Sequence, residues 1–251
     1  VLFPIKFISA IQQARSALAQ TDAVVGFGGY VSAAAYLAAW SKSIPIVVHE
    51  ANAKPGWANR LGRKFADVVA VNFSRVKTIW PESILTGIPI RTGISELAES
   101  GAIKRNERAN SFGLDPSRPI VAVFGGSQGS SRINSAISDY IKNPSVTGLQ
   151  IIHAVGPNNP LPERKSDYFP LPYFEDMPAI YDVSDYLITR SGAVTCAELL
   201  TVGKFAILVP LPHGNGEQAE NASELVDSGN AVLVSDEAFN GDWLRQNLPG
   251  I

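Results

Sequence analysis

The sequence has few residues of the kinds that build disulfides and metal centres. It contains a single cysteine, Cys196, and three histidines among 251 residues. One cysteine excludes an intrachain disulfide and cannot alone form a cysteine-rich zinc site, and it is typical of proteins from a reducing compartment. No run of 18 or more apolar residues occurs, so the sequence predicts no membrane-spanning helix.

The charge balance and the absent motifs disfavour further classes. Lys and Arg number 21 and Asp and Glu number 23, which gives a net charge of −2 and predicts no nucleic-acid partner. The sequence lacks the GK[ST] of a P-loop and the GxGxxG of a dinucleotide-binding turn, so a nicotinamide cofactor is disfavoured. Because the chain starts without methionine and its last residues interrupt a helical pattern, we expect a piece of a longer protein.

Short apolar runs alternate with helix-length segments along the chain. The runs are rich in β-branched residues and lie at 23–27, 44–50, 68–72, 119–126, 149–156, 185–189, 205–210 and 231–235. Strands that are apolar throughout and separated by helices predict parallel sheets covered on both faces. The sequence therefore predicts an α/β protein of two Rossmann-like domains, the first incomplete at 1–93 and the second truncated at 117–251, with the polar segment 94–116 as the interdomain connection.

Two glycine-rich turns follow predicted strands and precede predicted helices. GFGGYVS covers residues 26–32 and FGGSQGSSRIN covers residues 124–134. Glycine lets the backbone approach a ligand, and a helix N-terminus offers free N–H groups to an anion. In the second turn, the hydroxyl and N–H of Ser127 are suited to a phosphate. The alternative is a pair of glycine turns that bind nothing.

A polar cluster follows the strand at 44–50 directly. His49, Glu50 and Asn52 come at its end, where parallel α/β sheets place their ligand sites. Three polar groups together favour a site over the structural role that a single histidine at a strand end usually has.

The stretch TRSGAVTCAELL, residues 189–200, is apolar except for one acid, Glu198. Ser191 is a candidate N-cap for a helix beginning near Gly192, and Thr195 shares a helical face with Glu198. Glu198 then lies roughly 9 Å from the helix start, which is about the distance from a nucleotide diphosphate to its ribose. We expect hydrogen bonds from a ribose diol to satisfy this carboxylate only when ligand binds; the alternative is a surface glutamate.

The segment LPHGNGEQAENA, residues 211–222, follows the next predicted strand. A loop with two glycines leads to a helix that begins with Glu217 and Gln218. A carboxylate and an amide suit the hydroxyl groups of a sugar, whereas the alternative is an ordinary acidic helix start.

Together these segments resemble the MurG family, the bacterial N-acetylglucosaminyltransferases of glycosyltransferase family 28 that convert lipid I to lipid II in peptidoglycan synthesis. In chain order, the resemblance rests on GFGGYVS, HEANAKPGWANR, GIPIR, FGGSQGSSRIN, YFEDM, TRSGAVTCAE and PLPHGNGEQAENA, which span nearly the whole chain. It implies the two-domain GT-B fold, in which the C-terminal domain holds UDP-N-acetylglucosamine and the N-terminal domain holds the lipid acceptor.

The resemblance also implies roles for individual residues. The donor-binding residues are Arg91, Ser127, Phe174, Ala193, Thr195, Glu198, Glu217 and Gln218. The acceptor-binding residues are Gly28, Gly29, Tyr30, His49 and Asn52. Glu198 is expected on the ribose, Ser127 on the diphosphate and the Phe174 backbone on the uracil. His49 is the catalytic candidate within this sequence, although the family's leading candidate for the general base is a histidine in an N-terminal glycine-rich loop that this sequence lacks.

The implied reaction is an inverting transfer that requires no metal and no cofactor besides the donor substrate. The implied partners are UDP-N-acetylglucosamine, lipid I and the cytoplasmic face of the inner membrane, where the protein is expected as a peripheral protein. Leu2, Phe3, Phe7 and Ile8 lie near Lys6 and Arg15, a combination that suits an anionic membrane surface; the alternative is an amphipathic helix packed on its own sheet. Two rival functions stay open: a UDP-N-acetylglucosamine epimerase and a non-catalytic UDP-binding module.

Overall fold

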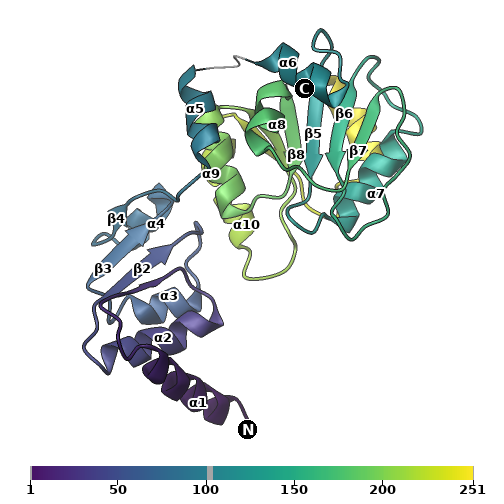
Figure 1. The fold of residues 1–251 in the computed structure, drawn as a ribbon. Coiled ribbons are helices and arrows are strands. Elements are labelled where there is room, and N and C mark those ends of the chain that lie inside the picture. The colour runs from purple at the N-terminus through teal and green to yellow at the C-terminus, as the bar shows by residue number, and fades with distance from the viewer. Residues whose placement is uncertain (1, 101–103, 251) are drawn as a thin grey trace. The chain divides into compact units, whose positions relative to one another are not determined.

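The computed structural model describes residues 2–100 and 104–250. The chain divides into two compact units, unit 1 at Val1–Pro89 and unit 2 at Ile90–Ile251 (Figure 1). No helix among the described residues is both long and apolar enough to cross a membrane.

Unit 1 is a small parallel sheet with helices. Its elements are α1 (Leu2–Ala17), β1 (Val24–Gly26), α2 (Tyr30–Trp40), β2 (Ile46–Glu50), α3 (Trp57–Gly62), β3 (Val68–Val71), α4 (Ser74–Ile79) and β4 (Ile84–Leu85). The strand order is β1-β2-β3-β4, so each strand pairs with the next one in the chain, and all pairs are parallel. Connections between successive parallel strands usually contain a helix, as they do here.

The core of unit 1 is built around Tyr36 of α2. This ring is fully buried with Ala39, Ile46 and Val48. It occupies the space that a side chain at Gly26 would need, since a Cβ there would lie 2.2 Å from the tyrosine oxygen. The glycine at the end of β1 therefore lets α2 pack directly on the strand.

Unit 2 contains the rest of the chain. Its elements are α5 (Thr92–Ser100), α6 (Arg105–Phe112), β5 (Ile120–Phe124), α7 (Ser131–Tyr140), β6 (Gln150–Ala154), β7 (Tyr168–Leu171), α8 (Met177–Val183), β8 (Tyr186–Thr189), α9 (Ala193–Val202), β9 (Phe205–Leu208), α10 (Glu217–Asn221), α11 (Ser223–Asp227), β10 (Ala231–Leu233), α12 (Gly241–Asn247) and the 3-10 turn η1 (Leu248–Gly250).

The strand order of unit 2 determines where a ligand can bind. The six strands are all parallel in the order β10-β9-β8-β5-β6-β7. The first strand, β5, therefore lies in the middle of the sheet, with β6 on one side and β8 on the other. The chain leaves β5 and β8 in opposite directions, which opens a crevice at their carboxyl ends, the usual ligand site of such sheets.

The core of unit 2 follows the two-residue period of the strands. Val121 and Val123 of β5 pack against Ile133 and Ile137 of α7, in a cluster that also includes Leu244 of α12. All of these side chains are buried. Alternate residues of a strand point to opposite faces, and every residue of β5 is buried, so the sheet is covered on both faces as the sequence predicts.

The α/β class and each predicted strand are confirmed, and the parallel pairing agrees with the apolar runs. The sequence reading missed β4, which has two residues, and β7, which contains a proline. The predicted connection 94–116 differs from the structure, because its helices α5 and α6 pack against α8 and α9 as part of unit 2. Figure 1 shows α5, α8 and α9 side by side.

Candidate active site

A cavity of about 430 Å³ lies at the crevice of unit 2. Its lining comes from the loops that follow β5, β8 and β9 and from the start of α10. The residues that line it are Gly125, Gly126, Ser127, Gln128, Gly129, Ser130, Ser131, Thr189, Arg190, Gly192, Thr195, Leu211 and Gln218. The cavity thus coincides with the point at which the strand order reverses.

The first wall of this cavity is the turn 126–129. The N–H of Gly129 donates to the carbonyl of Gly126 at 3.0 Å, and both glycines have positive φ angles, 77° and 93° respectively. Ser127 lies at the exposed tip of the turn. Within the described part of the chain, no residue hydrogen-bonds to its N–H or its hydroxyl, so both donors are available to an anion.

The second wall is the N-terminus of α9. Gly192 is the N-cap and supplies no side-chain cap, so the first N–H groups of this ten-residue helix have no partner among the described residues. The prediction that Ser191 caps the helix is wrong, because this residue precedes the cap and its hydroxyl is fully buried without a partner. The free N–H groups and the helix dipole both favour a negative group in the cavity.

Arg190 also lines the cavity, and no role for it was predicted from the sequence. Its guanidinium donates to the hydroxyl of Ser130 at 2.7 Å and to the carbonyls of Val209 and Pro210 at 3.0 Å. It also forms an ion pair with Asp236 at 2.5 Å. One side chain therefore ties the ends of β8 and β9 to the cap of α7. A cation directly after an apolar strand was the available sequence signal.

Glu198 is buried, but a protein cation already satisfies it. Its carboxylate accepts from Arg91 at 2.5 Å and from the hydroxyl of Tyr181 at 3.0 Å. The expectation that only a bound diol completes its hydrogen bonding is therefore wrong, and the side chain does not line the cavity described above. The structure nevertheless brings together two predicted donor residues that are 107 positions apart in the sequence.

Burial shapes the chemistry of two other groups near Glu198. Burial, reinforced by the neighbouring Glu198 carboxylate, raises the pKa of Tyr181 well above its ordinary value, so the phenol remains a hydrogen-bond donor. Cys196 is fully buried on α9, and burial raises the pKa of its thiol to about 12. The single thiol is therefore kept in its unreactive, protonated form.

The remaining predicted donor residues differ in their availability. Gln218 lines the cavity, and its side-chain carbonyl accepts from the N–H of Leu211 at 3.0 Å. Glu217 instead accepts from the N–H of Asn215 at 3.1 Å and so folds back on its own loop. Phe174 is buried edge-on against Phe124, with ring centres 6.0 Å apart, and none of the described residues hydrogen-bonds to its backbone.

The predicted acceptor residues of unit 1 surround a second glycine turn. Gly28 and Gly29 have φ angles of 91° and 85°, and Gly29 is the N-cap of α2 without a side-chain cap. Tyr30 is largely exposed, and its ring lies 5.8 Å from that of Trp57. The turn therefore presents helix N–H groups beside exposed aromatic surface.

The polar cluster after β2 is mostly engaged by the protein itself. Glu50 is buried and accepts from the N–H groups of Asn52 and Gly56 and from the Asn59 amide, all within 3.0 Å. The Nε2 atom of His49 lies 2.8 Å from the carbonyl of Gly87, to which it donates, and its buried Nδ1 has no partner among the described residues. Glu50 thus shapes the loop, whereas the Nδ1 atom of His49 stays without a partner among the described residues.

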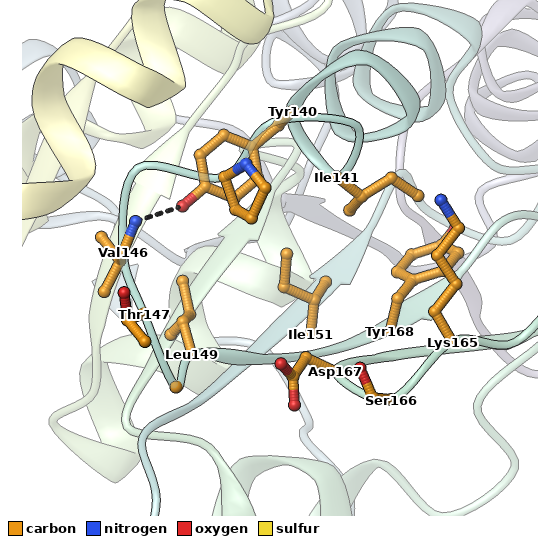
Figure 2. Close-up of a pocket in the computed structure, with 12 residues that line it drawn as sticks. Tyr140, Ile141, Val146, Thr147, Leu149, Ile151, Lys165, Ser166, Asp167 and Tyr168 are labelled. Atoms are coloured by element: carbon orange, nitrogen blue, oxygen red, sulfur yellow. Dashed lines mark hydrogen bonds between the residues drawn. The ribbon is translucent and has the colours of Figure 1, made fainter.

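A different cavity, of about 240 Å³, lies at the amino ends of β6 and β7 (Figure 2). Figure 2 shows Ile151 between Leu149 on one side and the neighbouring Tyr168 and Lys165 on the other. Because ligands of open parallel sheets bind at the carboxyl ends of the strands, this cavity lies at the wrong end of the sheet to share the site on the turn 126–129.

Comparison with known proteins agrees with this geometry. The glycosyltransferase family 28 C-terminal domain matches residues 120–250, and the family's N-terminal domain matches residues 2–71. A protein from Frankia casuarinae, named as a UDP-N-acetylglucosamine–N-acetylmuramyl-(pentapeptide) pyrophosphoryl-undecaprenol N-acetylglucosamine transferase, is 46% identical over 254 residues, which cover 97% of this chain and 66% of that protein. The chain thus spans about two thirds of the length of the curated relatives it matches.

Solved structures share the fold. The crystal structure of MurG from Acinetobacter baumannii has a TM-score of 0.75 at 28% identity and covers 98% of this chain and 70% of that one. A UDP-GlcNAc 2-epimerase from Methanocaldococcus jannaschii, in complex with UDP-GlcNAc and UDP, has a TM-score of 0.57 at 14% identity and covers 97% of this chain and 73% of that one. The second likeness concerns the fold alone.

Proposed function

Because the chain belongs to glycosyltransferase family 28, we propose that unit 2 binds UDP-N-acetylglucosamine and that the whole protein transfers this sugar to lipid I. The acceptor is undecaprenyl-pyrophosphoryl-MurNAc-pentapeptide, and the product is lipid II of peptidoglycan synthesis. The name of the relative from Frankia, at 46% identity, supports this assignment.

The observation that carries the proposal is the group of unpartnered donors in the cavity of unit 2. Ser127, whose N–H and hydroxyl have no partner among the described residues, lines the same cavity as Gly192 and Thr195 at the start of α9. A nucleotide diphosphate carries the negative charge that such donors stabilise, and the helix dipole adds to the attraction. Arg190, whose charge is paired with Asp236, supports this wall of the cavity through its hydrogen bond to Ser130.

The nucleoside and the sugar extend from the diphosphate in this proposal. Arg91 is half exposed, so its guanidinium can turn toward the base while Tyr181 continues to donate to Glu198. The ribose hydroxyls then donate to the carboxylate oxygen that Arg91 releases. Thr195 and Gln218 line the cavity and offer a hydroxyl and an amide to the phosphate and the N-acetylglucosamine.

The chemistry is a single displacement that inverts the anomeric carbon. A hydroxyl oxygen of the acceptor sugar bonds to that carbon while a base takes the hydroxyl proton, and the bond from the carbon to the UDP oxygen breaks. The departing charge is stabilised by the N–H groups of the turn 126–129 and of α9, without a bound metal. His49 has a positioning role in this proposal, because its ring is buried and donates to Gly87.

Unit 1 binds the lipid acceptor in this proposal. The diphosphate of the lipid meets the N–H groups at the start of α2, beside Gly28 and Gly29. On α1, Ile5 and Ile8 are largely exposed, whereas the side chains of Leu2 and Phe3 lie outside the described residues. These apolar side chains and the nearby Lys6 support peripheral attachment to the cytoplasmic side of the membrane. Within unit 1, α1 packs mainly on α2.

Calorimetric titration of the chain with UDP tests the donor site. We expect saturable binding that weakens about fivefold to tenfold in Ser127→Ala, which loses one hydrogen bond to the diphosphate. The matched control is Ser145→Ala, an exposed serine on another loop of unit 2, which is expected to bind UDP like the unsubstituted chain. Absence of UDP binding at millimolar concentration would overturn the donor assignment.

A turnover assay with UDP-N-acetylglucosamine and a lipid I analogue tests the transfer. We expect a disaccharide product in the presence of acceptor, and an unchanged rate when EDTA is added. Formation of epimerised UDP-sugar without acceptor would contradict the transferase function and indicate an epimerase. Tight UDP binding without turnover, in the full-length protein as well, would leave a non-catalytic UDP-binding module.

A further inference from the structure

Two loops of unit 2, one of which lines the donor cavity, are in direct backbone contact. The first is the turn 126–129, and the second, residues 155–159, follows β6. A Cβ at Gly129 would lie 2.0 Å from the carbonyl oxygen of Val155, and a Cβ at Gly156 would lie 2.3 Å from the carbonyl oxygen of Gln128. A side chain at either position would clash with the opposite loop, so only glycine lets the two backbones approach this closely.

Asn159 joins these two loops with one amide group. Its Nδ2 atom donates to the carbonyl of Gln128 at 3.0 Å and to the carbonyl of Val155 at 2.8 Å. Its own N–H donates to the carbonyl of Gly156 at 3.1 Å. Both hydrogens of the amide are thus used within the protein, and the side chain has a fixed position although the residue itself is exposed.

The loop on which Asn159 lies is itself anchored to the sheet. The N–H of Val155 donates to the carbonyl of Leu171, and that of Gly156 donates to the carbonyl of Pro172, both at 3.0 Å. The carbonyl of Val155 also accepts from the amide of Asn134 on α7 at 2.8 Å. The bond to Gln128 therefore connects the turn 126–129 to a rigid part of unit 2.

The bond from Asn159 acts on one peptide plane of the turn. The carbonyl of Gln128 accepts from Asn159, and the N–H of the same peptide, on Gly129, donates to Gly126. This plane is therefore held at both ends. The turn begins and ends with glycines of positive φ, which have many accessible conformations when nothing holds them.

We propose that Asn159 is a positioning residue for the donor diphosphate: it holds the turn 126–129 in the conformation in which Ser127 and Gln128 line the cavity. This inference rests on the proposed function of unit 2. Removal of the amide releases the turn, so a nucleotide must order it on binding, and affinity for the donor falls.

The test compares three variants by titration with UDP. Asn159→Ala removes both hydrogen bonds, and we expect the Kd for UDP to rise about tenfold. Asn159→Asp keeps the shape but puts a carboxylate oxygen against two carbonyl oxygens, so we expect a larger loss. Asn158→Ala is the matched control, because the Asn158 amide donates to the side chain of Gln128, at 3.2 Å, and not to its backbone. UDP binding by this variant is expected to stay unchanged.

A kinetic measurement distinguishes positioning from a general loss of folding. In the turnover assay, Asn159→Ala is expected to raise KM for UDP-N-acetylglucosamine about tenfold and to leave KM for the acceptor and the melting temperature close to those of the unsubstituted protein. Equal changes in both KM values, or UDP binding by Asn159→Ala equal to that of the unsubstituted chain, would overturn the inference alone. If the unsubstituted chain binds no UDP, the proposed function fails and the inference fails with it.

Discussion

The two glycine turns of this protein have the same layout in the sequence and different surroundings in the structure. Each follows a parallel strand and leads into a helix. The N-terminus of α2 has no side-chain cap, and that of α7 is capped by Ser130. The turn at 26–29 is flanked by exposed Phe27, Tyr30 and Val31. The turn at 126–129 is flanked by Arg190 and Gln218 in a polar cavity. The first surface suits the head of an amphiphile, and the second suits a nucleotide.

The polar groups near the two turns also differ in whether other groups of the protein satisfy their hydrogen bonds. In unit 1, the Asn59 amide accepts from the hydroxyl of Tyr36 and donates to the carboxylate of Glu50. In unit 2, the side-chain hydroxyls of Ser127 and Thr195 have no hydrogen-bond partner among the described residues. A polar residue at the end of a strand is therefore evidence for a ligand only when the protein leaves its hydrogen-bonding groups free.

The largest difference between the two turns is expected when the last glycine of each turn is replaced by alanine. Gly129→Ala combines a positive φ with a Cβ that meets the Val155 carbonyl at 2.0 Å, so we expect UDP binding to weaken at least about 100-fold. Gly29→Ala has only the φ strain, since nothing lies within 4 Å of its Cβ. It is expected to lower turnover and leave UDP affinity unchanged. An equal loss of UDP affinity in both variants would contradict the inference that only the turn 126–129 binds the nucleotide.

A pH-dependent loss of the stability of unit 2 is expected because of His153, which lies in β6. Burial lowers the pKa of His153 to about 4, and its ring bonds Tyr168 and Asn134. The unfolded chain, with an ordinary histidine pKa of about 6.5, takes up the proton first as the pH falls. Stability is therefore complete above pH 6.5 and decreases by up to about 3 kcal/mol as the pH falls to 4.

Thermal unfolding measured between pH 4 and pH 8 checks this expectation. His153→Gln, which cannot take up a proton, should flatten the pH dependence over that window, although its stability at neutral pH is lower. His213→Gln is the control, because this histidine is exposed on a loop and is expected to leave the profile unchanged. A profile of His153→Gln as steep as that of the unsubstituted chain would contradict the assignment.

Beneath the first turn, a smaller effect on stability is expected. Glu50→Gln keeps the shape of the buried side chain but presents an NH₂ group to one of three donors, so we expect a loss of about 2 kcal/mol. Because the residue belongs to unit 1, UDP affinity should stay the same. Thermal unfolding and UDP titration of the same sample measure both, and an altered UDP affinity would refute the separation of the two roles.

The smallest effect is expected at the surface of α1. Ile8→Glu replaces a largely exposed apolar side chain and adds a charge that an anionic membrane repels, so vesicle binding should weaken about fivefold to tenfold. Flotation with phosphatidylglycerol vesicles measures it, and Ile84→Glu, at an exposed position of β4, is the control. If both variants weaken binding equally, α1 has no special role.

More of the fold than of the site could be predicted from the sequence. Apolar, β-branched runs require burial on both faces, and this requirement alone predicts parallel sheets with helices between the strands. Strand order does not follow from local pattern, and it is the order β8-β5-β6 that opens the cavity. The resemblance grouped Arg91 with Glu198, but their direct ion pair depends on where α5 packs.

The residues that sequence reasoning missed act through long-range backbone contacts. Asn159 and Arg190 bond to carbonyl oxygens of residues 4 to 31 positions away, and a carbonyl has no signature in the sequence. Ser191 was misassigned for a related reason, because the cap depends on which residue first adopts helical angles. Side-chain chemistry can be inferred from residue type, whereas backbone partners become visible only in the folded chain.

The buried thiol of Cys196 makes the protein convenient for spectroscopy. A maleimide dye needs a thiolate at an accessible surface, and this thiol offers neither. Two cysteines introduced at exposed positions, one at Gln13 in unit 1 and one at Ser145 in unit 2, can therefore be labelled without first removing the natural one. Energy transfer between the two dyes then reports the separation of the units in solution, with and without nucleotide.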